Sequence, residues 1–238
     1  MNIDIVEELG KLAGAVKAHP MLELLEHEVR PPVADKVVRE VEKKLGHAVP
    51  DPVKSFYRQA DGAKLSWRFK PRLSKKKKDQ AREEFKELAA PPDIVFKVAG
   101  NINLLPLRDS LLDEEYAIPQ NEEVEGEFDF EGKVYSDNEF CRMLRPFDFI
   151  DDYYAMAFVV RPGAPNWKMM LLGDYWIEYD SSRVTWLEDY LRFVVATWGI
   201  RRAREKLFSE YRGDKQPPLT FDAGLAARVV PAVLTSPA

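Results

Sequence analysis

The sequence contains very little cysteine or histidine. Cys141 is the only cysteine in 238 residues, so the chain cannot form a disulfide within itself or gather a cluster of thiolate ligands. Its three histidines are His19, His27 and His47, all in or beside the first expected helices. A zinc site needs several such ligands together and a hydrolytic nucleophile needs a base beside it, so this scatter favours neither. We expect no catalytic residue, no metal site and no cofactor.

Long apolar runs and common catalytic motifs are also absent. No stretch approaches the ~20 apolar residues that span a bilayer, and the opening MNIDIVEELGKL carries acids where a signal peptide carries a basic patch. No G-x-S-x-G, Walker loop, dinucleotide fingerprint or H-E-x-x-H occurs, since HEVRP at 27–31 lacks the second histidine. We expect a cytoplasmic protein with no membrane partner and no enzymatic activity.

The composition is typical of a globular domain. Hydrophobic residues make up 45% of the chain and charged residues 32%, and the length suits one main domain. The formal net charge of −5 is unevenly distributed, because residues 64–87 hold a basic cluster and residues 113–131 are rich in Asp and Glu. Local fields should therefore matter more than the net charge.

The first thirty residues predict two helices. Asp4 is the expected N-cap of the first. Apolar residues then recur at helical spacing, namely Ile5, Leu9, Leu12 and Val16. Residues 21–28 give a second helical run, and RPP interrupts it because proline lacks the backbone donor that a continuing helix needs. We interpret residues 1–30 as an N-terminal helical extension.

Residues 42–69, EKKLGHAVPDPVKSFYRQADGAKLSWRF, carry closely spaced structural signals. A helix should end at Gly46, because glycine adopts the left-handed conformation most easily. Asp51 is the expected N-cap of a second helix, with Pro52 at its first position. DGAK at 61–64 is a turn, and LSWRF alternates apolar with polar residues. The stretch predicts helix, tight corner, helix, turn and strand.

The next segment, residues 70–93, is charged and ends with Pro-Pro. We interpret it as a surface insertion with one short helix at about 79–89. Its KKKK at 75–78 is either a solvated loop tip or a contact for phosphates, which would gain affinity at low salt by counterion release. No stacking aromatic residue is interleaved with the lysines, so we expect no direct nucleic-acid binding.

Most of the remaining sequence predicts strands and two late helices. Strands are expected at 94–99, 102–107, 154–161, 167–173 and 175–180, the first two joined by a hairpin-like turn. Thr185 and Glu188 form a T-x-x-E capping box before a helix that continues to Gly199. A final helix at about 200–211 precedes a C-terminal tail at 213–238.

This order of elements resembles the SUKH superfamily, which includes the fungal cell-wall assembly regulator and many bacterial immunity proteins. The family's helix, corner, helix and turn signature is matched here by Glu42, Leu45, Gly46, Pro50, Phe56, Tyr57, Asp61 and Gly62. INLLPL at 102–107 resembles the strand that follows, and TWLEDYLRFVVATWG at 185–199 resembles the closing helix. The resemblance covers roughly 31–200, and insertion 70–93 has no clear counterpart.

The resemblance implies an α+β domain at 31–212, with a mostly antiparallel sheet and helices packed on one side. It also implies binding without catalysis, because bacterial members bind and block toxins that are often nucleases or deaminases. Eukaryotic members act as scaffolds or regulators. We therefore expect a non-catalytic immunity protein that neutralises a cognate toxin. The alternative is an interaction scaffold or regulatory subunit of a larger cellular assembly.

Acidic side chains supply the candidate partner-binding residues. They are Glu122, Glu123, Glu125, Glu127, Asp129, Glu131, Asp151 and Asp152. Residues 120–133 predict a hairpin or loop, where alternation with phenylalanine would place the last three of its acids on one strand face. Such a face either docks into the basic cleft of a nuclease toxin or merely keeps the hairpin soluble. Asp148, Asp151 and Asp152 also allow a glycosidase reading, which is weaker because aromatic residues before a strand usually form core.

Overall fold

A computed structural model describes residues 2–88, 92–114, 126–152, 154–173, 184–208 and 217–235. Its helices are α1 (Ile5–Ala18), α2 (Asp35–Leu45), α3 (Asp51–Tyr57), α4 (Lys75–Glu84), the 3-10 helix η1 (Pro92–Phe96), α5 (Leu107–Leu112), α6 (Asp137–Met143), α7 (Leu187–Ala196), α8 (Arg201–Phe208), α9 (Ala223–Arg228) and α10 (Ala232–Thr235). Its strands are β1 (Leu22–Val29), β2 (Ala63–Phe69), β3 (Gly100–Leu104), β4 (Glu127–Phe130), β5 (Lys133–Ser136), β6 (Leu144–Phe149), β7 (Ala155–Val159), β8 (Lys168–Leu172) and β9 (Thr185–Trp186).

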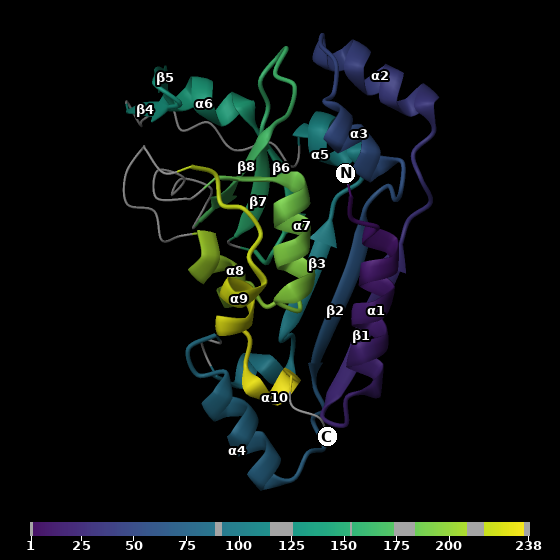
Figure 1. Cartoon of the computed structure of the whole chain (residues 1–238), viewed down its shortest axis with the longest axis vertical. Helices are drawn as coiled ribbons and strands as arrows, with labels where there is room; N and C mark the ends of the chain where they lie inside the picture. The colour runs from purple at the N-terminus through teal and green to yellow at the C-terminus, as the bar shows by residue number, and fades with distance from the viewer. Residues whose placement is uncertain are drawn as a thin grey trace.

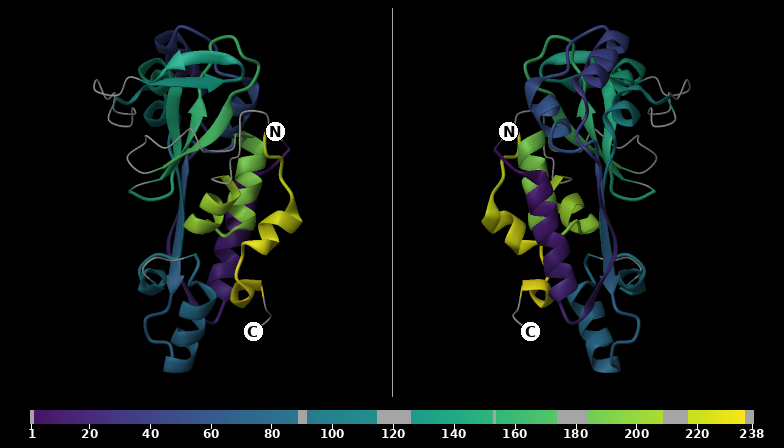
Figure 2. Two further views of the ribbon diagram at one scale, coloured as in Figure 1. Left: turned by 90° about the vertical axis from the view of Figure 1, so that its left-hand side faces the viewer. Right: turned by 90° about the vertical axis from the view of Figure 1, so that its right-hand side faces the viewer.

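One sheet organises the molecule. Its strands run in the order β1-β2-β3-β6-β7-β8-β9, and each of these neighbouring pairs is antiparallel. Helices α1 and α7 lie side by side against one face of the long strands, as Figures 1 and 2 show. The expected α+β class, with a mostly antiparallel sheet and a helical layer, is confirmed.

Strand β2 shows how the sequence builds the main core. Its alternate residues Ala63, Leu65, Trp67 and Phe69 are buried, and the polar residues between them are half-buried. Successive side chains of a strand point to opposite faces, so the buried set faces the helical layer. Leu9 of α1 and Leu191 of α7, both fully buried, belong to the same core.

A smaller core covers the reverse face of the sheet at its β7 and β8 end. The β4–β5 hairpin and α6 lie there, and Phe140 of α6 packs with Ala157 and Met170 of the sheet. A capping box begins α6, with Ser136 and Glu139 bonded to each other's backbone amides. The hairpin and α6 therefore cover β7 and β8 on the sheet face opposite the helical layer.

The N-terminal prediction is half right. Helix α1 begins after its N-cap Asp4 as expected. Residues 21–28, however, are not helical, because β1 pairs with β2 along its whole length from Leu22↔Phe69 to Val29↔Ala63. The apolar residues of this segment fit the spacing of a helix as well as that of a strand. It forms a strand because it pairs with the edge of β2. The first thirty residues are thus an edge strand and a covering helix rather than a purely helical extension.

Three other local predictions are wrong. Residues 94–99 begin within the 3-10 helix η1 instead of forming a strand. Thr185 lies in β9 and donates its hydroxyl to the Leu219 carbonyl at 2.6 Å, so it does not cap α7. Helix α3 takes Pro50 as its N-cap, one residue before the expected Asp51. The strand expected at 175–180 lies outside the described residues.

The charged insertion and the C-terminal tail both belong to the packed structure. The lysines at 75–78 form the first turn of α4 behind the N-cap Ser74, not a loop tip. The tail contains α9 and α10, and the Val233 amide of α10 donates to Glu84 of α4 at 2.6 Å. These contacts place α4 and α10 together at one end of the long axis (Figure 1).

Candidate functional site

Strands β1, β2 and β3 have one face that points away from the helical layer (Figure 2). The strand register places polar residues of all three strands on that face. We call this set the open face: Glu23, Glu26, Glu28, Lys64, Ser66, Arg68, Asn101 and Asn103. The register places Glu28, Lys64 and Asn103 in one row across the three strands. Directly paired residues of antiparallel strands share a face, so the rows form one surface.

Part of the open face is fixed by its own hydrogen bonds. Arg68 donates from Nε to Glu23 at 2.8 Å, and Asn101 donates from Nδ2 to the carbonyls of Phe149 and Ile150 at 3.1 and 3.0 Å. Ser66, Lys64 and Asn103 make no side-chain hydrogen bond or ion pair with another described residue. The centre of the open face therefore retains donors and acceptors for a partner.

A groove of about 490 Å³ hollows the open face where it meets η1. We call it the basal groove. Its apolar lining consists of Leu88, Ile94, Val95, Val98, Ala99 and Ile150. Its polar lining consists of Ser66, Asn101, Asp151, Asp152, Arg201 and Arg202. An apolar lining with a few placed polar groups is the usual make-up of a binding site.

The acidic lip of the basal groove is held in a defined conformation. Asp151 accepts the Tyr154 amide at 2.9 Å and pairs with Arg201 at 2.6 Å. The Arg201 guanidinium also lies 4.7 Å from the centroid of the Tyr154 ring. This arrangement fixes the turn between β6 and β7, so the groove has a pre-formed edge.

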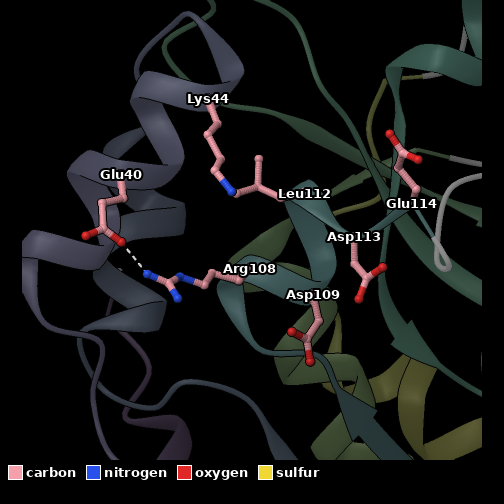
Figure 3. A pocket seen from close by; sticks show the side chains of 7 residues that line it. All are labelled: Glu40, Lys44, Arg108, Asp109, Leu112, Asp113 and Glu114. Atoms are coloured by element: carbon pink, nitrogen blue, oxygen red, sulfur yellow. Dashed lines mark hydrogen bonds and ion pairs between the residues drawn. The ribbon is translucent and has the colours of Figure 1, made fainter.

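Two further hollows continue the open face in the other direction. The first, about 120 Å³, lies among Lys64, Asn103 and Phe149. The second, about 500 Å³, lies between α2 and α5 and shares Asp109 with the first. Figure 3 shows this second hollow, with Glu40 and Arg108 paired across it. The basal groove and the first of these hollows lie on the open face, and the hollow between α2 and α5 continues from them, so the three form a discontinuous trough.

Asp109, which lines two of these hollows, has a raised pKa. Partial burial raises the pKa of its carboxyl, and the neighbouring charges of Asp113 and Asp61 act in the same direction against Arg30. A raised carboxyl pKa means that the charged form is disfavoured where it sits. The folded chain therefore disfavours the charge of Asp109, mainly because its carboxyl is partly buried.

A buried ionic network joins the sheet behind the open face to two helices. Asp148 of β6 accepts from Tyr190 Oη and from Arg204 Nη1, both at 2.6 Å, and from the Asn103 amide at 2.8 Å. Arg204 also donates to the carbonyls of Gly199, at 2.9 Å, and Asn101. The side chains of Asp148, Tyr190 and Arg204 are fully buried. The network thereby joins β3 and β6 to α7 and α8.

The network also shifts the pKa values of Tyr190 and Arg204. Burial raises the pKa of Tyr190, and the adjacent Asp148 carboxylate raises it further. For Arg204, burial lowers the pKa, but Asp148 and Tyr190 outweigh that effect and leave it above the ordinary value. The guanidinium is therefore charged at every relevant pH, and the network is a structural ion pair between helices and sheet.

The structure separates the predicted partner-binding residues into four groups, of which Glu131 is the last. Asp151 and Asp152 line the basal groove. Glu127 and Asp129 are exposed on β4, as the alternation predicts, and their hairpin lies on the same sheet face as the trough. Glu122, Glu123 and Glu125 lie outside the described residues.

Glu131 does not share that strand face. It lies in the hairpin turn with φ of 58° and forms ion pairs with Arg161 and Lys168. Asp129 also has a structural part, because its Oδ1 accepts the Gly132 amide at 2.9 Å. The acidic surface of the hairpin is therefore smaller than the sequence suggests.

Sequence reasoning did not identify the residues of the open face. The polar residues of β2 alternate visibly with apolar ones, and this pattern marks one face of the strand as more exposed than the other. The partners Asn101 and Asn103 carry no comparable signal, because only the strand order brings them beside β2. The groove likewise collects residues from segments between 66 and 202.

Comparison of the chain with protein-family models, with curated proteins and with solved structures found no match. No helix in the described ranges has both the length and the apolar character that crossing a membrane requires. Within the same ranges, no group of ≥ 3 His, Cys, Asp or Glu side chains is placed to hold a metal ion.

Proposed function

We propose that this chain is a non-catalytic protein-binding domain, and that it serves as a cytoplasmic immunity protein that binds and neutralises a cognate bacterial toxin. The observation that carries the proposal is the trough along the open face. It combines the side chains of Ser66 and Asn103, which bond to no other described residue, with an apolar groove on a sheet that the helical layer covers from behind. The resemblance of residues 42–62 to the SUKH signature supports the same class of function.

Neutralisation would act by steric occlusion. A rigid sheet can cover a toxin's active site without large ordering costs, and affinity would concentrate in a few anchors in the hollows. The exposed acids Glu127 and Asp129 lie on the hairpin that covers the same sheet face at β7 and β8, and they would speed association with a basic cleft, such as that of a nuclease.

The test is co-purification of the tagged protein with the product of its neighbouring gene, together with a growth assay in the presence and absence of this protein. We expect a stable complex and rescue from toxicity. Ser66→Arg with Asn103→Arg should abolish both, because the added side chains obstruct the trough. Ala15→Arg is the matched control, since it adds an arginine at an exposed position on α1 in the helical layer.

The outcomes separate the possibilities. Equal binding by the open-face variant and the control would contradict the assignment of the surface. Recovery of a lasting assembly of non-toxic cellular proteins, with no toxicity to rescue, would replace immunity by the scaffold or regulatory role.

A further inference from the structure

The end of the molecule that carries α4 is strongly basic. Its cations are Lys70, Arg72, Lys75, Lys76, Lys77, Lys78 and Lys97, which we call the basic pole. They are exposed or half-buried, and none of them forms an ion pair with another described residue. A chain with a net charge of −5 therefore keeps a large positive field at one end.

The acids near the basic pole do not neutralise it. Asp79 and Asp93 both pair with Arg82, at 3.1 and 2.7 Å. Glu83 pairs with Lys86 at 2.5 Å, and Glu87 pairs with Lys206 at 3.2 Å. These four acids pair with only three cations, Arg82, Lys86 and Lys206, and Glu84 pairs with none of the described cations. Two negative charges are therefore left against the seven cations of the basic pole.

The basic pole is mounted on a fixed support. Ala81 and Phe85 are fully buried, and the Phe85 ring packs 5.3 Å from Phe69 and 6.5 Å from Trp67 between centroids. At the end of α4, Glu84 accepts the Val233 amide. A charged surface on a braced helix loses less conformational entropy on binding than one on a loose loop.

The basal groove begins beside this pole. Helix η1 and the residues after it form one wall, where Ile94 and Val98 face the groove. On the same helix, the Phe96 ring lies 6.0 Å from Lys78 Nζ and 5.3 Å from the Arg82 guanidinium of α4. Val98 is 42% exposed, which is unusual for a large apolar side chain in this structure. An apolar hollow and a field of cations thus share one wall.

We propose that the basal groove and the basic pole together bind an acidic polypeptide segment with a large apolar anchor side chain. The anchor would enter the groove against Val98 and Ile94, and flanking carboxylates would face the lysines of α4. The inference rests on the proposed function only in taking the partner to be a protein. It adds the chemistry by which that partner is recognised at this end of the trough.

A phosphate backbone suits this surface less well. Phosphates would satisfy the lysines but leave the apolar groove unfilled, because a nucleic-acid backbone offers no aliphatic group to bury there. Phe96 is only partly buried, but its ring lies beneath Lys78 and Arg82, so it does not offer a free stacking surface. Acidic and apolar groups together use both halves of the site.

The test is fluorescence anisotropy of the full chain with a short labelled peptide of glutamate and serine around a central leucine. We expect binding that weakens with salt, and that weakens about tenfold when the leucine becomes alanine. Lys75→Glu with Lys76→Glu should weaken binding by about tenfold or more. Lys36→Glu with Lys43→Glu is the matched control, because both lysines are exposed on α2 at the other end of the molecule.

A second variant distinguishes the contribution of the basal groove to peptide binding from that of the lysines. Val98→Glu should abolish the advantage of the leucine peptide over the alanine peptide, and it leaves the lysines in place. The proposal is overturned if neither peptide binds, or if a short DNA duplex binds more tightly and Val98→Glu leaves its affinity unchanged. The latter result would assign the pole to phosphates.

The same variants distinguish this inference from the proposed function. If the charge-reversed α4 variant and Val98→Glu still form the toxin complex and rescue growth as the unmodified chain does, this inference fails and the immunity role stands. If the peptide binds as expected but no toxin is neutralised, the immunity role fails and the recognition chemistry stands.

Discussion

Replacing Arg204 by methionine should destabilise the protein severely. Removing one partner of a buried ion pair costs about 3–5 kcal/mol, because the remaining charge stays out of water without compensation. Here Asp148 would keep its bonds from Tyr190 and the Asn103 amide but lose the cation at 2.6 Å. The carbonyls of Asn101 and Gly199 would each lose a donor as well. Methionine retains much of the arginine stem volume, so lost packing adds little.

Urea unfolding followed by tryptophan fluorescence measures this free energy. Arg204→Lys should cost less than the methionine variant, because it keeps the charge but not the planar fork that reaches several acceptors. Tyr190→Phe should cost about 1.5–3 kcal/mol, the value of a hydrogen bond to a charged group. A loss below about 1 kcal/mol for Arg204→Met, as for an exposed ion pair, would refute the view that this network braces the sheet.

Three further changes test other parts of the account. Phe85→Ala should lower the unfolding free energy by about 3–5 kcal/mol in the same urea assay, because the ring is fully buried against Trp67 and Phe69; a small loss would mean that α4 is not part of the core. Asp109→Asn should stabilise the protein near pH 7, because the raised pKa of Asp109 means that the folded state disfavours its charged form. This gain in stability should vanish toward pH 4, where the aspartate of the unfolded chain also becomes protonated. Urea unfolding midpoints measured across this pH range test the prediction. Glu127→Gln with Asp129→Asn should slow toxin association severalfold at low salt and little at high salt in stopped-flow measurements, whereas an unchanged rate would remove the hairpin from the encounter surface.

Local signals predicted the stretch from α2 to β2 well. Gly46 ends α2 with φ of 77°, and Gly62 takes φ of 87° at the turn before β2. A Cβ at Gly62 would lie 2.6 Å from the Leu104 carbonyl oxygen, so the site excludes other residues sterically as well. The left-handed conformation of both glycines depends on nearest neighbours along the chain, which the sequence displays directly, whereas the close approach of Leu104 to Gly62 depends on the pairing of β2 with β3.

The remaining features depend on partners that are distant in the chain. Residues 21–28 become a strand because β2 offers an unpaired edge, and no local period specifies that choice. The excess of positive charge around Lys75 depends on where the nearby acids lie, and Asp93, which pairs with Arg82 beside Asp79, comes from beyond the end of α4. The open face depends on strand order. A single sequence shows the residue types for all three but not their pairing.

Hydrogen–deuterium exchange of the co-purified complex shows whether the partner covers the open face. Partner binding should slow amide exchange in β1, β2, β3 and at residues 150–152, and it should leave exchange in α1 unchanged. Protection confined to α1 and α7, with the strands of the open face exchanging as in the unbound chain, would contradict this expectation.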